Sequence, residues 1–147
     1  QIACAEDFPP LRLKEKGTTH MSETEEFRKS LKGQVVSIRE ERTIMAAAQL
    51  LDKHSIGALL VMKDDAIVGI ITERDIVRRV AAKGVSSKEV LVKDIMTRDV
   101  IAVDVKEGIK KIFDILRQSP FRHLPITDNG KPIGMVSKRD LLYLFDK

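Results

Sequence analysis

Several residue types are scarce in this sequence, and each shortage narrows the range of structures and functions. Tryptophan is absent and aromatic residues make up only 4%, so aliphatic side chains must supply most of the 43% hydrophobic content. No apolar run approaches the roughly 18 residues that a membrane span needs. The single cysteine, Cys4, excludes an internal disulfide and a metal site built on several cysteines, and is typical of a reduced, cytoplasmic protein.

The motifs of common catalytic sites are missing as well. The sequence contains no Gly-x-Gly-x-x-Gly fingerprint, no P-loop, no His-Glu-x-x-His and no nucleophile elbow. We therefore expect no catalytic residue and no metal site, and predict that the protein is not an enzyme. The net charge of +4, with both signs interspersed, does not indicate nucleic-acid binding.

The first 21 residues differ in character from the rest. They are polar and irregular, and they lack the apolar core of a signal peptide. His20-Met21 is a pair often left where a coding sequence joins a vector-encoded leader. We expect residues 1–21 to be such a leader or a disordered tail, and the native chain to start at Met21.

The remainder of the chain is a tandem repeat with an offset of 65 residues. Gly69–Asp75, with the sequence Gly-Ile-Ile-Thr-Glu-Arg-Asp, recurs as Gly134–Asp140, with the sequence Gly-Met-Val-Ser-Lys-Arg-Asp. At the same offset, without a gap, most apolar positions coincide although few residues are identical. Matched spacing with matched apolar positions indicates a duplicated unit. We assign residues 22–84 to the first repeat and 85–147 to the second.

Each repeat has the pattern β-α-β-β-α. In the first repeat, β-branched and helical periodicities predict strands at 35–38, 58–62 and 67–71, a helix capped by Thr43, and a helix from Thr72 to about Lys83. In the second repeat the same periodicities predict strands at 100–103, 123–127 and 133–136, with helices at 108–118 and from Ser137. A three-stranded sheet with two helices leaves one sheet face open. We therefore predict an α/β (α+β) fold whose two repeats pack as a pseudo-twofold pair through their sheets.

A short helix is expected to lead into each repeat. Ser22–Glu25 resembles a capping box, and it precedes Phe27 and Leu31 on one helical face. Val92 and Met96 occupy the equivalent places before the second repeat. We group each lead-in with the repeat that follows it in the sequence.

The repeated signature carries the residues best suited to a ligand. Thr72 lies where a strand becomes a helix, and the unpaired N–H groups of a helix start favour an anion. Arg74 suits a phosphate, and the carboxylate of Asp75 suits the two hydroxyls of a ribose. The second repeat offers Ser137, Arg139 and Asp140 at the same places, and Lys138 in addition. Plain helix capping by the hydroxyl and the carboxylate is the competing interpretation.

A nucleotide base would also need a flat, apolar slot beside the signature. The candidates are the residues that open the first and second strands of each repeat: Val36, Ser37, Ile56, Gly57 and Ala58, and then Ile101, Ala102, Arg122, His123, Leu124 and Pro125. Ordinary core packing explains the apolar members equally well. His123 has the competing role of a structural histidine in a sheet.

Together these features resemble the tandem CBS (cystathionine-β-synthase) domain pair, or Bateman module. The resemblance rests on the paired repeat, the Gly-x-x-Thr/Ser-x-x-Asp signature, Asp-Ile-Met-Thr at 94–97 and Phe-Arg-His-Leu-Pro-Ile at 121–126. It spans about Glu25–Lys147. One departure is that Lys29–Lys32 replaces Asp-Ile-Met-Thr in the first repeat, which questions the equivalence of the two sites.

The resemblance implies a regulatory module that binds an adenosyl ligand (AMP, ADP, ATP, NAD(H) or S-adenosylmethionine) in clefts between the repeats. It implies that Thr72, Asp75, Ser137 and Asp140 hold the ribose and phosphate, and that the strand-opening residues line the base. It also implies a homodimer, a regulated partner protein of unknown identity, no catalytic cofactor and no membrane. The alternative is an interaction scaffold that assembles without a nucleotide.

Overall fold

The computed structural model describes residues 23–31 and 35–145, with side chains as far as Leu141. The roles expected for Ser22, Cys4 and the rest of residues 1–22 lie outside this range. The described chain forms two compact units. The first is built from residues 36–100, and the second from residues beyond 100 together with the helix α1 (Glu23–Leu31).

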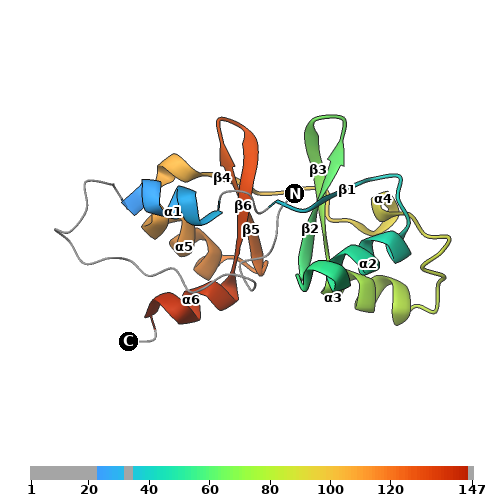
Figure 1. Ribbon diagram of the computed structural model, residues 1–147. Coiled ribbons are helices and arrows are strands. Elements are labelled where there is room, and N and C mark those ends of the chain that lie inside the picture. The colour runs from blue at the N-terminus through green and yellow to red at the C-terminus, as the bar shows by residue number, and fades with distance from the viewer. Residues whose placement is uncertain (1–22, 32–34, 146–147) are drawn as a thin grey trace. The chain divides into compact units, whose positions relative to one another are not determined.

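The first unit is a three-stranded sheet with its helices on one side (Figure 1). The sheet order is β1-β2-β3, with β1 parallel to β2 and β3 antiparallel to β2. The elements are β1 (Ser37–Arg39), α2 (Ile44–His54), β2 (Ala58–Lys63), β3 (Ala66–Thr72), α3 (Glu73–Ile76), the π-helix η2 (Val77–Ala81) and α4 (Val92–Ile95).

The second unit has the same topology, with the order β4-β5-β6. Its elements after α1 are β4 (Val103–Asp104), the 3₁₀-helix η3 (Val105–Glu107), α5 (Ile109–Gln118), β5 (His123–Asp128), β6 (Lys131–Ser137) and α6 (Lys138–Phe145). Both hairpins even carry a register irregularity at equivalent places, after Val61 and after Ile126. The predicted mixed α/β fold with a duplicated β-α-β-β-α unit is therefore confirmed.

Local chemistry accounts for the main elements. The hydroxyl of Thr43 accepts a hydrogen bond from the Ala46 N–H at 3.2 Å, which starts α2 where the sequence predicted a cap. The hairpin of the second unit turns at Asn129-Gly130, whose φ angles of 51° and 81° are left-handed. These two residue types tolerate that conformation at least cost, so the turn fixes the pairing of Asp128 with Lys131.

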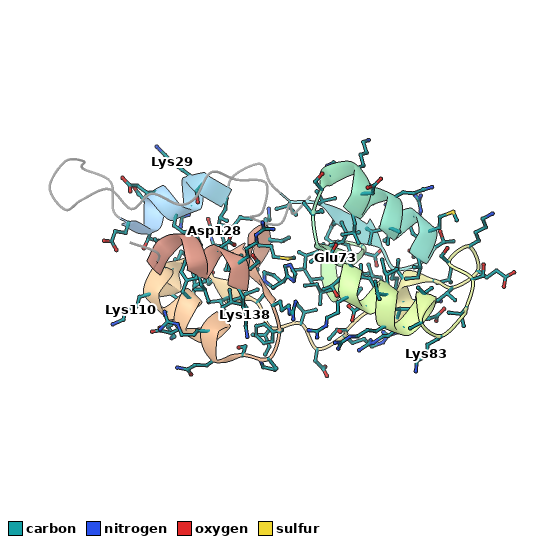
Figure 2. All side chains as sticks on the ribbon, turned by 90° about the horizontal axis from the view of Figure 1, so that it is seen from below. Lys29, Glu73, Lys83, Lys110, Asp128 and Lys138 are labelled. Atoms are coloured by element: carbon teal, nitrogen blue, oxygen red, sulfur yellow. The ribbon has the colours of Figure 1, made fainter. Side chains whose placement is uncertain are left out.

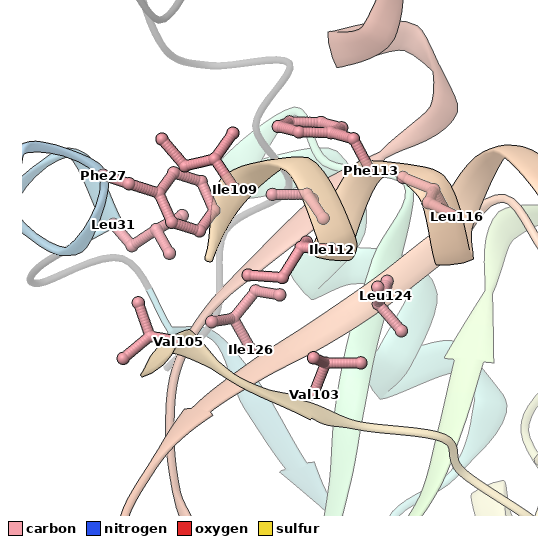
Figure 3. Packing of buried hydrophobic residues seen from close by; sticks show 11 residues of the cluster. Phe27, Leu31, Val103, Val105, Ile109, Ile112, Phe113, Leu116, Leu124 and Ile126 are labelled. Atoms are coloured by element: carbon pink, nitrogen blue, oxygen red, sulfur yellow. The ribbon is translucent and has the colours of Figure 1, made fainter. Parts of the chain in front are cut away.

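The core of the second unit joins α1 to α5 and the sheet. Phe27 and Phe113 lie with ring centroids 6.3 Å apart, and both side chains are almost fully buried. Figure 3 shows Phe27 and Leu31 reaching from α1 toward the α5 side chains, with Val103, Leu124 and Ile126 among the sheet residues of the same cluster. Apart from Phe27 and Phe113, the buried residues of this cluster are aliphatic, as expected for a sequence so poor in aromatic residues.

Each lead-in helix packs on the other repeat from the one that follows it in the sequence. Leu31 of α1 contacts Gly134 on β6 of the second unit, where a Cβ would lie 2.8 Å from the Leu31 Cβ. Met96, which follows α4, contacts Gly69 on β3 of the first unit, where a Cβ would lie 2.5 Å from the Met96 Sδ. The helix α1 therefore packs within the second unit although it precedes the first repeat in the sequence. The lead-in needs an apolar sheet surface with a glycine, and it finds one across the sequence boundary.

Two further segments differ from expectation. The strand predicted at 100–103 begins only at Val103, and Ile101 is 55% exposed. The helix predicted from Thr72 to about Lys83 changes from α to π geometry at Val77, before Gly84 ends it with a φ of 70°. Periodicity alone does not separate α from π geometry in so short a helix.

Candidate functional site

The signature of the first unit forms a reciprocal cap at the end of β3. One carboxylate oxygen of Asp75, Oδ2, accepts hydrogen bonds from the N–H of Thr72 at 3.0 Å and from its hydroxyl at 2.9 Å. In return the Asp75 N–H donates to the Thr72 hydroxyl at 3.1 Å. The capping role considered from the sequence is therefore present, and it uses Oδ2 of the carboxylate.

The second unit repeats this arrangement in a more buried form. The Asp140 Oδ2 accepts from the Ser137 N–H at 2.7 Å and from the Ser137 hydroxyl at 3.3 Å. Ser137 and Asp140 are 3% and 7% exposed, whereas the Asp75 side chain is 16% exposed. The two signatures thus have the same fold but differ in access to solvent.

Each helix start lies against the opening of the middle strand. The N–H of Glu73 donates to the Gly57 carbonyl at 3.0 Å, and the N–H of Lys138 donates to the Arg122 carbonyl at 2.9 Å. Glu73 and Lys138 are labelled in Figure 2, where they mark the two helix starts. Backbone pairing of Thr72 with Ala58, and of Ser137 with His123, places each signature beside the first residue of the middle strand, at one end of its sheet. Part of the anion-binding capacity expected at these helix starts is therefore already used.

The predicted residues of the first unit lie at or near this end of the sheet. Thr72 and Asp75 meet the opening of β2, and Ser37 lies near it on β1, where it pairs with Leu60. Arg74 is exposed at the helix start, while Ser37 and Asp75 are half-buried. The apolar candidates Val36, Ile56 and Ala58 are buried, as is Gly57.

The second unit brings together a similar set with a different apolar part. Leu124 belongs to the core cluster and Pro125 is buried, so these two lie within the fold. His123 is half-buried. The exposed candidates are Arg122, Arg139, Ile101 and Ala102. The Lys138 ammonium group, predicted as a ligand contact, donates to the Ser119 carbonyl.

One residue of the first site was not predicted. Arg79 places its Nε 3.9 Å from the Asp75 Oδ1, and its Nη1 donates to the Ile95 carbonyl at 2.7 Å. The i,i+4 spacing of Asp75 and Arg79 was the sequence signal for the first of these contacts. Among the described residues, no group of three or more His, Cys, Asp or Glu side chains is placed to hold a metal ion.

Comparison with protein families explains the duplicated unit. The family model for the CBS domain matches residues 29–82 and 92–147. This chain belongs to the CBS-domain family. The two matches coincide with the two sequence repeats, and the resemblance inferred from the signature is confirmed.

Relatives with this pair of domains include regulatory and assembling proteins. CBSX3, a mitochondrial CBS domain-containing protein of Arabidopsis thaliana, is 32% identical over 146 residues, which cover 94% of this chain and 71% of CBSX3. A structure described as a signal-transduction protein with CBS domains from Burkholderia ambifaria is 33% identical with a TM-score of 0.70, and the match covers 78% of this chain and 85% of that one. The hexameric CBS-CP12 protein of bloom-forming cyanobacteria is 29% identical with a TM-score of 0.68, covering 78% and 68%.

The match to CBSX3 also bears on the N-terminal segment. Coverage of 94% is more than residues 22–147 can supply, so part of the segment 1–21 aligns with a natural protein. None of the helices in the described part of the chain has the length and apolar character needed to cross a bilayer.

Proposed function

We propose that this protein is a regulatory module whose two CBS repeats bind an adenosyl ligand: AMP, ADP, ATP, NAD(H) or S-adenosylmethionine. Binding would modulate a partner protein or the protein's own assembly, in the cytoplasm and without a catalytic step. The family resemblance supports a ligand held beside the signatures of the repeats. A signal-transduction description and a hexameric assembly among its structural relatives support a regulatory, self-associating module.

The observation that carries the proposal is that the two oxygens of the Asp75 carboxylate make different contacts. Oδ2 takes the two capping hydrogen bonds, while Oδ1 faces only the weak, solvent-exposed ion pair with Arg79 among the contacts described. An oxygen in this position can accept a hydroxyl of a ribose without loss of the cap. Capping and ligand binding are therefore compatible at this residue.

The surrounding groups suit the rest of a nucleotide. Arg74 and Arg139 present exposed guanidinium groups one residue before the signature carboxylates, within reach of a phosphate. Ile101 and Ala102 offer exposed apolar surface of the kind that stacks on a base. A single exposed isoleucine is ordinary on a protein surface, so Ile101 is offered as a place where a base would stack and not by itself as evidence for one.

A thermal-shift panel tests the proposal directly. AMP, ADP, ATP, NAD, NADH or S-adenosylmethionine at about 100 times its Kd should add about 2.7 kcal/mol to the free energy of unfolding. For a domain of this size the melting temperature then rises by several degrees. No shift with any of the six compounds contradicts adenosyl binding and favours the interaction scaffold, whose assembly light scattering would then show.

Variants assign the binding to the signatures. Asp75→Asn and Asp140→Asn keep an oxygen for the cap but lose the charge, so each should weaken one site about ten-fold or more. Asp104→Asn is the matched control, because Asp104 also caps a helix, through the Lys106 N–H at 2.8 Å, but lies toward the hairpin end of the sheet. Unchanged affinity in the double variant at 75 and 140 contradicts the ribose assignment.

A further inference from the structure

The two repeats differ most in the helix that follows the signature. In the first repeat the helix widens into the π-helix Val77–Ala81, closed by the hydrogen bond from the Ala82 N–H to the Val77 carbonyl at 2.8 Å. In the second repeat α6 continues as an α-helix to Phe145. Single π-turns are rare and frequently mark functional positions. The residues at this place also differ, since Arg79 corresponds to Leu144 at the repeat offset.

Arg79 joins the signature to the end of α4. Its Nε lies 3.9 Å from the Asp75 Oδ1, and its Nη1 donates to the Ile95 carbonyl at 2.7 Å. The carbonyl groups at the carboxyl end of a helix attract a cation, so the second contact is a C-terminal cap for α4. One side chain thus touches the proposed ligand oxygen and a helix end that is 16 residues further along the chain from Arg79.

The helix that Arg79 caps is anchored at both ends, and its start is held by two backbone hydrogen bonds to the carbonyls of residues 40 and 42. Val92 is fully buried, and Met96 packs on Gly69. Thr97 and Ile70 exchange two backbone hydrogen bonds, each 3.0 Å long. Beyond these anchors Arg98 and Asp99 are exposed and lead out of the first unit. The end of α4 is therefore the last fixed point before the connection to the second repeat.

We propose that Arg79 is a positioning residue that couples the first nucleotide site to this connection, a contact that Leu144, at the equivalent position of the second repeat, has no guanidinium group to make. Without a ligand, Arg79 bridges Asp75 and the carbonyl of Ile95. A ribose hydroxyl on the Asp75 Oδ1 competes with the guanidinium, which loosens the cap on α4. The competition by a ribose hydroxyl, the ligand step, rests on the proposed function. The contacts of Arg79 with Asp75 and with the Ile95 carbonyl, the bridge, do not.

Amide hydrogen exchange in the ligand-free, full-length protein tests the bridge. The reporter is the Met96 N–H, which donates to the Val92 carbonyl at 2.9 Å and is released when the end of α4 opens. Arg79→Leu, which introduces the residue found at position 144, should speed its exchange about two- to five-fold, as expected for a half-exposed charge contact. Asp75→Asn should speed it less, and should add nothing in the Arg79→Leu background.

Arg98 provides the matched control. Its guanidinium donates to the Lys93 carbonyl at 3.0 Å, so it also caps α4, but no contact of Arg98 with Asp75 is described. Arg98→Leu should speed exchange at Met96 while the effect of Asp75→Asn persists in that background. Equal effects of Asp75→Asn with and without Arg79, or no effect of Arg79→Leu, would overturn the bridge.

AMP is the probe for the ligand step. Saturating AMP should speed Met96 exchange about two-fold in the natural protein and leave it unchanged in Arg79→Leu, whose first site should bind AMP about two- to five-fold more tightly. If AMP stabilises both proteins and changes exchange equally, the coupling is wrong and the proposed function stands. If no adenosyl compound binds, the proposed function fails, and the ligand-free cycle still decides whether the bridge exists.

Discussion

Substitution of Gly134 by alanine is the sharpest test of the exchanged lead-in helices. The new Cβ would lie 2.8 Å from both the Cβ and the Cδ2 of Leu31, and 3.0 Å from its Cγ. The Cβ of Leu31 is fixed to the α1 backbone, so a rotamer change does not relieve the clash. The helix must move away from β6 as a body, which separates Phe27 from Phe113 as well.

The expected cost follows from that movement. Overpacking a core by one methyl typically costs about 1–3 kcal/mol. The upper limit is the loss of α1 from the sheet, which exposes Phe27 and Leu31, now 1% and 4% exposed, at about 1.5–3 kcal/mol each. We therefore expect Gly134→Ala to lower the free energy of unfolding by about 1–3 kcal/mol, with a fall of about 3–5 °C in Tm for each kcal/mol.

Urea unfolding of a double-mutant cycle measures this cost and its origin. Leu31→Ala removes the Cγ and Cδ2 atoms that crowd position 134, so the two changes together should cost at least about 1 kcal/mol less than their sum. Gly84→Ala serves as the control, because a Cβ there meets nothing within 4 Å and only the φ of 70° opposes it. Its effect should add to that of Leu31→Ala.

Two results would refute this reasoning. The first is a Gly134→Ala protein as stable as the natural one, which would mean that α1 does not lie on β6. The second is additivity of Gly134→Ala and Leu31→Ala within about 0.5 kcal/mol, the usual limit for residues that do not touch. Faster amide exchange in α1 but not in α2 would support the predicted movement.

Three further outcomes are expected, each measured by urea unfolding. Thr43→Ala removes the cap of α2 and should cost about 1 kcal/mol, whereas Thr43→Ser, which keeps the hydroxyl, should cost much less. Phe113→Ala leaves a cavity beside Phe27 and should cost about 3–5 kcal/mol; a smaller loss would mean that α1 and α5 are not packed together. Glu107→Gln removes the exposed ion pair with Lys111 and should cost less than about 1 kcal/mol, a cost that high salt should reduce further.

Local chemistry made much of each repeat predictable. The Thr43 cap, the Asn129-Gly130 turn and the strands of both hairpins depend on residues within a few positions of one another. The capping of Thr72 by Asp75 was predictable for the same reason. Errors at the strand ends, such as the late start of β4 at Val103, arise where few hydrogen bonds hold the chain.

The packing of the lead-in helices was not predictable from such local signals. The equivalence of Phe27 with Val92, and of Leu31 with Met96, was visible in the sequence. The structure places Leu31 and Met96 each on a sheet glycine. Periodicity identifies which face of a helix is apolar, but it does not identify the sheet that receives this face. Lys29–Lys32 departs from Asp-Ile-Met-Thr, yet Leu31 fills the place of Met96, because the surface requires only an apolar side chain there.

These contacts show that different residues of the repeated signature have different roles in the structure. The glycine admits a lead-in side chain, and the Thr or Ser with Oδ2 of the Asp closes a helix cap. Both parts serve the packing and capping of the fold, so their repetition alone does not argue for a ligand. The argument for a ligand rests on groups outside the cap, namely the Asp75 Oδ1, which faces Arg79, and the exposed residues Arg74 and Ile101. Variants at these positions therefore separate binding from folding more cleanly than variants of the glycine or the hydroxyl.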